Sequence, residues 1–163
     1  MIKLIVLDVD GCLTDGKLIY SSDGESKNFS VKDGLGITTW IKLGFRVAII
    51  TGRTSKVVQT RADELGIQHL FQGVKDKNSV LKELIKSLSL KFYEVAAIGD
   101  DLNDYNMLNL VGRSFTPNNG VDDIKDIVDT VLTKNGGDGA VREMIDILVN
   151  ESDLKDKFLS VWV

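Results

Sequence analysis

Residues 2–16 read Ile2-Lys3-Leu4-Ile5-Val6-Leu7-Asp8-Val9-Asp10-Gly11-Cys12-Leu13-Thr14-Asp15-Gly16, an apolar run that ends in aspartates and glycines. Such a continuous Ile/Leu/Val run predicts a strand buried on both faces, as in a parallel sheet. Alternation along an extended strand would place Asp8 and Asp10 on the same side, at the mouth of the sheet. Like charges so close together are costly unless a cation joins them, which favours a functional site. The alternative is a pair of ordinary turn aspartates.

Two later apolar runs end in polar residues in the same way. Residues 46–50 lead into Thr51-Gly52-Arg53, and residues 95–98 lead into Gly99-Asp100-Asp101-Leu102-Asn103-Asp104. Strands alternate with helical segments over most of the chain, which predicts an α/β fold with a doubly wound parallel sheet. Ligands of such sheets bind beyond the carboxyl ends of the strands. We therefore expect Asp8, Asp10, Thr51 and Asp100 to meet at one rim.

Local patterns predict the remaining elements. Helical periodicity and end signals predict helices over 37–43, 55–65, 78–88 and 140–149, with a short one around 121–127. Further strands are expected over 68–71 and 128–132. No element is predicted for 113–116. A tail, residues 151–163, follows the last long helix, either as a local satellite core or docked on a neighbouring subunit.

A β-hairpin is predicted directly after the first strand. Residues 17–20 and 27–31 flank Ser22-Asp23-Gly24-Glu25, a turn signal between two β-prone runs. An isolated hairpin is marginally stable in water, and this one carries Leu18, Ile19, Tyr20 and Phe29. We expect other copies of the chain to cover these side chains in a homotetramer.

Composition excludes several classes of protein. The 163 residues fit one domain, and a net charge of −4 with a pI near 5.0 argues against nucleic acid as a partner. Cys12 is the only cysteine, so no intrachain disulfide forms and a reducing compartment is favoured. The first apolar run is too short to cross a bilayer and lacks a basic leader. The sequence thus predicts a cytoplasmic protein without a membrane partner.

Acids, a hydroxyl and an amine at one rim suit phosphoryl transfer. Mg²⁺ prefers oxygen ligands, so Asp8 and Asp100 are candidate metal ligands. An ionised aspartate can attack phosphorus without a general base, which would give an aspartyl-phosphate on Asp8. Asp10 could protonate the leaving group and then activate water, while Thr51 and Lys77 stabilise the phosphoryl oxygens. Taken alone, Lys77 would be a solvated lysine at the start of a helix.

Four ordered motifs resemble those of the haloacid dehalogenase superfamily: Asp8-Val9-Asp10-Gly11, Ile50-Thr51-Gly52, Lys77 and Gly99-Asp100-Asp101. The resemblance extends to Val149 and implies a capless HAD-like Rossmannoid domain over 1–150, with the hairpin at 17–31 in place of a cap. It implies Asp8 as nucleophile, Asp10 as acid/base, and Thr51 and Lys77 on the phosphoryl group. Mg²⁺ would be held by Asp8, the backbone carbonyl of Asp10, and Asp100. Asp104 is expected behind these ligands, where it steers Lys77, and the alternative is that Asp101 and Asp104 cap the helix that follows them.

Within that superfamily, the hairpin and several local motifs are similar to those of 3-deoxy-D-manno-octulosonate 8-phosphate phosphatases. The motifs are Phe29 to Gly36, Thr51-Gly52-Arg53, Arg61-Ala62, Gly99 to Asp104 and Gly136 to Glu143. The resemblance implies a capless tetramer of lipopolysaccharide precursor synthesis, in which neighbouring subunits close each other's active sites. It implies a sugar acid phosphate as substrate, bound by Asp10, Ser30, Val31, Lys32, Asp33, Gly34, Thr38, Gly52, Arg53, Arg61 and Lys77. Cys12 departs from the valine common in that family, a swap between small apolar groups.

Arg53 bears on which sugar acid is cleaved. It follows Thr51 by two residues, at the rim where the substrate would protrude, and an arginine fork matches a carboxylate. In related nine-carbon keto acid 9-phosphatases of the sialic acid type, the residue after Thr-Gly tends to be Glu. Arg53 therefore favours the eight-carbon substrate, with the nine-carbon one as the alternative and a solvated arginine as the plain interpretation.

Other functional classes fit the sequence less well. Receiver domains also place acids, Thr/Ser and Lys on a doubly wound sheet, but their acidic pair comes first and their phosphoryl acceptor later. The order here favours a phosphatase. An intact set of Asp8, Asp10, Lys77 and Asp100 disfavours a catalytically silent assembly subunit. Arg61 and Arg142 would be ordinary helix arginines without the family match, and His69 is expected as a packed or rim histidine rather than a ligand.

Overall fold

The first strand, β1 (Leu4–Leu7), lies in the middle of a parallel six-stranded sheet in the computed structural model, which describes residues 1–163. The strand order is β5-β4-β1-β6-β7-β8, and every neighbouring pair is parallel. The other strands are β4 (Arg46–Ile50), β5 (His69–Phe71), β6 (Val95–Ile98), β7 (Arg113–Thr116) and β8 (Thr130–Val131). Chain order reverses beside β1, which places the ligand-binding crevice of such sheets there.

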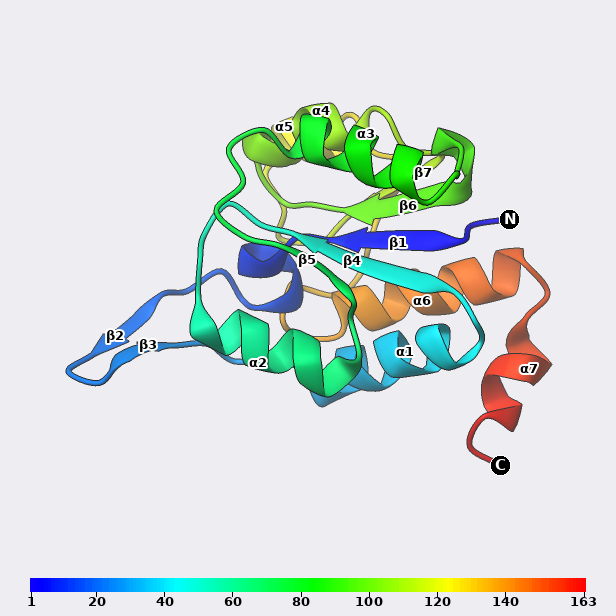
Figure 1. Cartoon of the computed structure of the whole chain (residues 1–163), viewed down its shortest axis with the longest axis horizontal. Coiled ribbons are helices and arrows are strands. Elements are labelled where there is room, and N and C mark those ends of the chain that lie inside the picture. The colour runs from blue at the N-terminus through cyan, green and yellow to red at the C-terminus, as the bar shows by residue number, and fades with distance from the viewer.

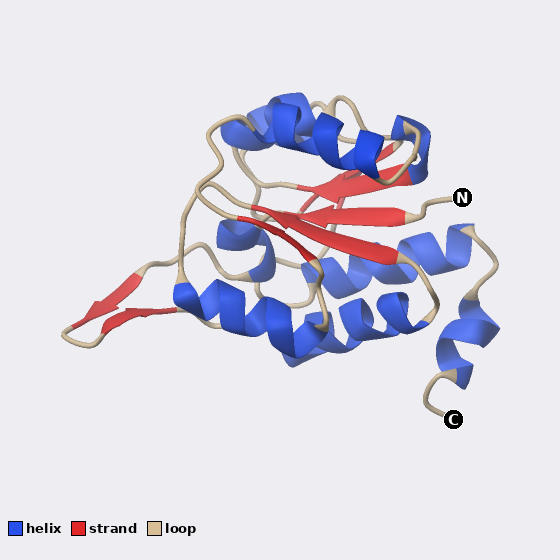
Figure 2. Ribbon diagram, in the orientation of Figure 1, coloured by secondary structure: helices blue, strands red, loops and turns tan.

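Helices cover both faces of the sheet (Figure 1). One layer holds α1 (Val31–Lys42), α2 (Lys56–Leu65) and α6 (Ala140–Glu151). The opposite layer holds α3 (Lys77–Ser87), α4 (Tyr105–Leu108) and α5 (Asp122–Lys125). Figure 2 shows the sheet strands between these two layers. The doubly wound parallel sheet predicted from the sequence is confirmed.

Alternation along β1 explains its uninterrupted apolar run. Ile5 and Leu7 belong to the core cluster beneath α1, α2 and α6, whereas Leu4 and Val6 belong to the cluster beneath α3, α4 and α5. All four side chains are fully buried. A central strand with helices on both faces has no solvent-facing side, so apolar residues fill every position.

Helix α1 begins at Val31, six residues before the predicted start at Ile37. The Ser30 side chain caps it by accepting a hydrogen bond from the backbone N–H of Asp33. Glycines in a helix disfavour it in isolation, which is why the early start was missed. Here they serve close packing: a Cβ on Gly34 would lie 2.3 Å from the Arg61 guanidinium, and one on Gly36 would lie 2.9 Å from Arg142.

The hairpin is present but shorter than predicted. Its strands are β2 (Ile19–Ser21) and β3 (Gly24–Ser26), paired antiparallel, and they project beyond the body of the molecule near the first turn of α2 (Figure 1). The predicted second strand over 27–31 is wrong, because this segment runs into α1. Phe29 packs against the core rather than standing exposed with Leu18, Ile19 and Tyr20.

The other differences concern the end of the chain. Residues 113–116 form β7, which was not predicted because Ser114 and Thr116 interrupt the apolar pattern, although both are buried. The tail forms α7 (Lys155–Ser160), whose Phe158 joins the core beneath α6. The indole N–H of Trp162 donates to Thr39 Oγ1 at 2.8 Å. The tail thus contacts α1 of its own chain, and docking on a neighbour stays a prediction. No helix is long and apolar enough to cross a membrane.

Candidate active site

A cleft of about 310 Å³ lies at the carboxyl ends of the central strands. Asp8 follows β1, Thr51 follows β4 and Asp100 follows β6, so the expected meeting of three strand ends at one rim is observed. The full lining comprises Asp8, Asp10, Gly16, Leu18, Thr51, Gly52, Arg53, Asp100, Asp101 and Asn103.

Asp8 and Asp10 share this cleft for a different reason from the one predicted. The strand ends at Leu7, and the chain then turns over Val9–Leu13 with non-helical backbone angles at Asp10 and Gly11, so strand alternation does not apply to the pair. Gly11 has φ +96° in this turn, and a Cβ there would lie 1.9 Å from Asp100 Oδ2. A glycine therefore lets Asp100 approach the turn that carries both aspartates.

Lys77 is the buried centre of an ion-pair network. Its side chain is 1% exposed, and its Nζ lies 2.7 Å from Asp8 Oδ1 and 2.6 Å from Asp104 Oδ1. Burial works against its charge, but the two carboxylates outweigh burial and raise the pKa of Lys77. Its position as the first residue of α3, after the N-cap Asp76, aims it at the cleft side of the sheet. The solvated-lysine interpretation is wrong.

The carboxylates around Lys77 carry more negative charge than it can balance. Burial and the nearby Asp104 raise the pKa of Asp8 well above its usual value, despite Lys77. Burial, with Asp104 and Asp101, raises the pKa of Asp100 to about 6. A bound cation would favour the ionised form of both groups. The electrostatics of the cleft therefore fit a divalent metal ion.

The donor set also fits Mg²⁺. Ligand atoms of Asp8, Cys12 and Asp100 all lie within 4.8 Å of one another. Burial and Asp100 raise the pKa of the Cys12 thiol well above its usual value, so the thiol stays neutral. Mg²⁺ takes oxygen rather than thiol ligands. The two carboxylates are therefore the side chains that could hold it, with Cys12 packed behind them.

Arg53 is engaged by the hairpin rather than free. Its guanidinium lies 2.6 Å from Glu25 Oε1 and 3.3 Å from the Tyr20 hydroxyl, and 3.9 Å from Asp10 Oδ2. The hydrogen bond from Arg53 lowers the pKa of Glu25, so both groups are charged. Lys27 also pairs with Asp10 and Glu25. Sequence reasoning missed Glu25 and Lys27 because it treated the hairpin only as an assembly element.

The remaining predicted substrate residues form a second cluster that does not line the cleft. Arg61 donates to the Ser30 backbone carbonyl at 3.4 Å and lies over the Phe29 ring. Asp33 accepts from the backbone N–H of Arg142 at 2.8 Å, and burial raises the pKa of Asp33 to about 6. The rest of this cluster comprises Val31 beside Arg61, Lys32 in a hollow against α6, Gly34 under Arg61, and Thr38, which donates to the Gly34 carbonyl.

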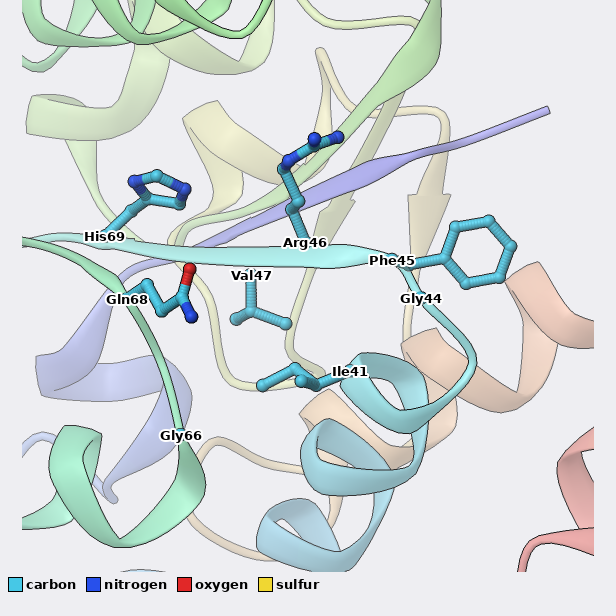
Figure 3. A pocket seen from close by; sticks show the side chains of 8 residues that line it. All are labelled: Ile41, Gly44, Phe45, Arg46, Val47, Gly66, Gln68 and His69. Carbon is cyan, nitrogen blue, oxygen red and sulfur yellow. The ribbon is translucent and has the colours of Figure 1, made fainter.

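A separate hollow of about 220 Å³ lies at the opposite end of the sheet (Figure 3). It is bordered by the first residues of β4 and β5, Arg46 and His69, and by the turn at Gly44. Burial and Arg46 lower the pKa of His69. None of its lining residues is a carboxylate, so this hollow lacks the acids of the cleft.

The sequence of the chain is similar to a family of hydrolases and to individual phosphatases. The family model of haloacid dehalogenase-like hydrolases matches residues 69–145. The 3-deoxy-D-manno-octulosonate 8-phosphate phosphatase of Haemophilus influenzae is 39% identical over 149 residues, which cover 91% of this chain and 83% of that protein. The Escherichia coli phosphatase of the same name is 40% identical over 91% of this chain and 79% of its own.

Solved structures agree with these sequence matches. The Moraxella catarrhalis 3-deoxy-D-manno-octulosonate 8-phosphate phosphatase, in complex with magnesium ion, phosphate ion and a KDO molecule, superposes with a TM-score of 0.95. It is 42% identical and the match covers 99% of this chain and 94% of that chain. The cleft at the ends of β1, β4 and β6 thus belongs to a fold whose relatives include phosphatases.

Proposed function

The chain belongs to the 3-deoxy-D-manno-octulosonate 8-phosphate phosphatases, within the haloacid dehalogenase-like hydrolases, and from this we propose that it hydrolyses that eight-carbon sugar acid phosphate. The observation that carries the proposal is the cleft in which Asp8, bound to buried Lys77, lies with Asp10 and Asp100. The products are 3-deoxy-D-manno-octulosonate and phosphate, in lipopolysaccharide precursor synthesis in the cytoplasm.

Asp8 and Asp10 divide the chemistry between them. A carboxylate oxygen of Asp8 attacks phosphorus, the bond from phosphorus to the sugar oxygen breaks, and Asp10 gives its proton to that oxygen. Asp8 now carries the phosphoryl group. In the second half-reaction Asp10 takes a proton from water, the hydroxide attacks phosphorus, and phosphate leaves with the Asp8 carboxylate restored.

The other residues of the cleft stabilise the phosphoryl group during its transfer. Thr51 follows β4 and is largely buried in the lining of the cleft, where its hydroxyl can donate to a phosphoryl oxygen. The Lys77 ammonium and the Gly52 backbone add further donors. Asp8, Asp100 and the Asp10 carbonyl would hold Mg²⁺, which when bound neutralises charge on the phosphoryl oxygens.

Arg53 would select the substrate through its carboxylate. The eight-carbon sugar acid carries this group at the end remote from its phosphate, and Arg53 lies at the mouth of the cleft, 43% exposed. Glu25 already occupies the guanidinium, so a substrate carboxylate has to replace or share that contact. In the nine-carbon 9-phosphatases the corresponding residue tends to be a glutamate, which would repel a carboxylate held there. Arginine at position 53 therefore supports the eight-carbon over the nine-carbon substrate.

The second cluster would act in the assembled protein. Ser30 to Gly34, Thr38 and Arg61 lie together on α1 and α2, outside the cleft of their own chain. The exposed Val31 and Lys32, with the half-buried Thr38 and Arg61, would close a neighbouring subunit's cleft, and the buried Asp33 and Gly34 would support them from behind. The tail at 151–163 is a further candidate for contact with a neighbour. These residues thus belong to the proposed site through the homotetramer.

We expect the purified chain to be a homotetramer. Leu18, Ile19 and Tyr20 are 39%, 45% and 69% exposed on a two-stranded hairpin, and such a hairpin has no core of its own to cover them. Light scattering at micromolar concentration should give the tetramer mass. Leu18→Lys and Ile19→Lys together should lower this mass. The control Tyr93→Lys, at an exposed position on the body of the molecule, should leave the mass unchanged. A fully active monomer would contradict the assembly.

The function itself is tested by phosphate release from a panel of sugar acid phosphates. With Mg²⁺ present, the eight-carbon 8-phosphate should have a higher kcat/KM than the nine-carbon 9-phosphates. Chelation by EDTA should abolish release, and added Mg²⁺ should restore it. A preference for the nine-carbon substrate would replace the proposed substrate and leave the reaction class intact.

A further inference from the structure

Lys27, the residue directly after the hairpin strand β3, contacts an acid of the catalytic cleft. Its side chain is 0% exposed, and its ammonium contacts Asp10 Oδ1 and lies 3.6 Å from Glu25 Oε1. Burying an ammonium costs several kcal/mol unless charged partners offset it. Its partners here are an acid of the reaction itself and a neighbour on the same hairpin. A lysine that only anchored the hairpin would not need to contact Asp10.

Lys27 holds only one of the two carboxylate oxygens of Asp10. The other oxygen, Oδ2, accepts no hydrogen bond within the chain, and Arg53 Nε lies 3.9 Å from it. One oxygen is thus fixed from the hairpin side while the other remains available in the cleft. This division suits a group that must present a proton in a defined direction.

We infer that Lys27 is a positioning residue for proton transfer by Asp10, so that the hairpin contributes to catalysis within its own chain. The inference rests on the proposed acid/base function of Asp10. As Asp10 gives its proton to the leaving oxygen, negative charge develops on its carboxylate, and the adjacent ammonium stabilises that charge. The proton moves from Asp10 to the leaving oxygen, and Lys27 keeps its own protons throughout.

The dependence of kcat/KM on the leaving group distinguishes this function from a structural one. With aryl phosphates, kcat/KM covers the steps up to release of the phenol, and phenols of low acidity need protonation most. We expect Lys27→Met to lose roughly tenfold or more on the least acidic phenol, and about threefold or less on the most acidic one. The logarithmic plot against phenol pKa therefore becomes steeper than that of the unaltered chain.

Matched variants control for folding and for charge. Lys17→Met removes an ammonium from the same hairpin that is 80% exposed and 3.8 Å from Asp15, and should leave the slope unchanged. Lys27→Arg keeps a cationic donor and should restore most of the loss. Asp10→Asn removes the proposed acid itself, so its plot of log kcat/KM against phenol pKa should have the steepest slope.

Each outcome bears on the inference. Equal loss by Lys27→Met on all aryl phosphates would overturn it and leave Lys27 as an anchor of the hairpin, as would no loss on any. If Lys27→Met does not fold, Lys27→Gln, which retains a hydrogen-bond donor without the charge, should steepen the plot of log kcat/KM against phenol pKa. A plot parallel to that of the unaltered chain would overturn the inference. An unchanged slope in Asp10→Asn would instead refute the proposed acid. Failure to hydrolyse the sugar acid phosphate would refute only the proposed substrate.

Discussion

Asp8→Asn is expected to lower phosphate release by about 10⁴-fold or more, to the background rate, with every substrate tested. The amide keeps the shape of the side chain but removes the attacking carboxylate and one proposed metal ligand. It also removes one of the two carboxylates that contact Lys77, while Asp104 remains at 2.6 Å. Phosphate release by the purified variant under steady-state conditions measures the loss.

The same variant should fold at least as well as the unaltered chain. Burial and Asp104 raise the pKa of Asp8, so the ionised group costs free energy of folding, and a neutral amide removes that cost. We therefore expect an unchanged or higher Tm by thermal denaturation. Asp15→Asn, an exposed aspartate just past the turn, is the matched control and should keep full activity. Near-normal turnover by Asp8→Asn would end the covalent mechanism.

Arg53→Glu is expected to lower kcat/KM for the eight-carbon phosphate by roughly ten- to thousand-fold, the scale of a lost charge-assisted pair with added repulsion. The new carboxylate would stand beside Glu25 and Asp10 and repel the substrate carboxylate. A generic aryl phosphate has no such group, so its slow hydrolysis should survive. Comparing kcat/KM for the two substrates gives the effect on specificity.

Two further variants separate attraction from repulsion. Arg53→Met removes the cation without adding a charge and should have a smaller effect than Arg53→Glu. Arg46→Glu makes the same charge change at the amino end of β4, far along the strand from the cleft, and should affect neither substrate. Equal loss on both substrates with Arg53→Glu would place Arg53 in the chemistry or the fold. No loss would leave Arg53 as a contact of the hairpin without a function in substrate selection.

The sheet was predictable because its central strands carry their own signal. β1, β4 and β6 are uninterrupted apolar runs ending in polar residues, and burial on both faces is the physical cause of that pattern. β7 lacked the pattern because a strand nearer the sheet edge accommodates Ser114, whose hydroxyl bonds to Asp129. The start of α1 was hidden because tertiary packing against Arg61 and Arg142 outweighs the low helix propensity of its glycines.

The site was predictable as far as strand ends define it. Asp8, Thr51 and Asp100 lie together because parallel strands end at one edge, and Lys77 because a helix begins there. The contacts of Lys27 and Glu25 could not be predicted, since they depend on how the base of the projecting hairpin lies beside Asp10 and Arg53. The same holds for Ser30, Asp33 and Arg61, whose local geometry is set by packing between α1, α2 and α6.

The most direct test of the account is rapid acid quenching during turnover, followed by mass spectrometry of the whole chain and its peptides. We expect one added phosphoryl group per chain, located on Asp8, formed with substrate and Mg²⁺ and lost on further incubation. Asp8→Asn should carry none, whereas Asp10→Asn, if it forms the intermediate at all, should retain the group longer. Phosphate release with no phosphorylated chain at any time, or with the group on another residue, would contradict the account.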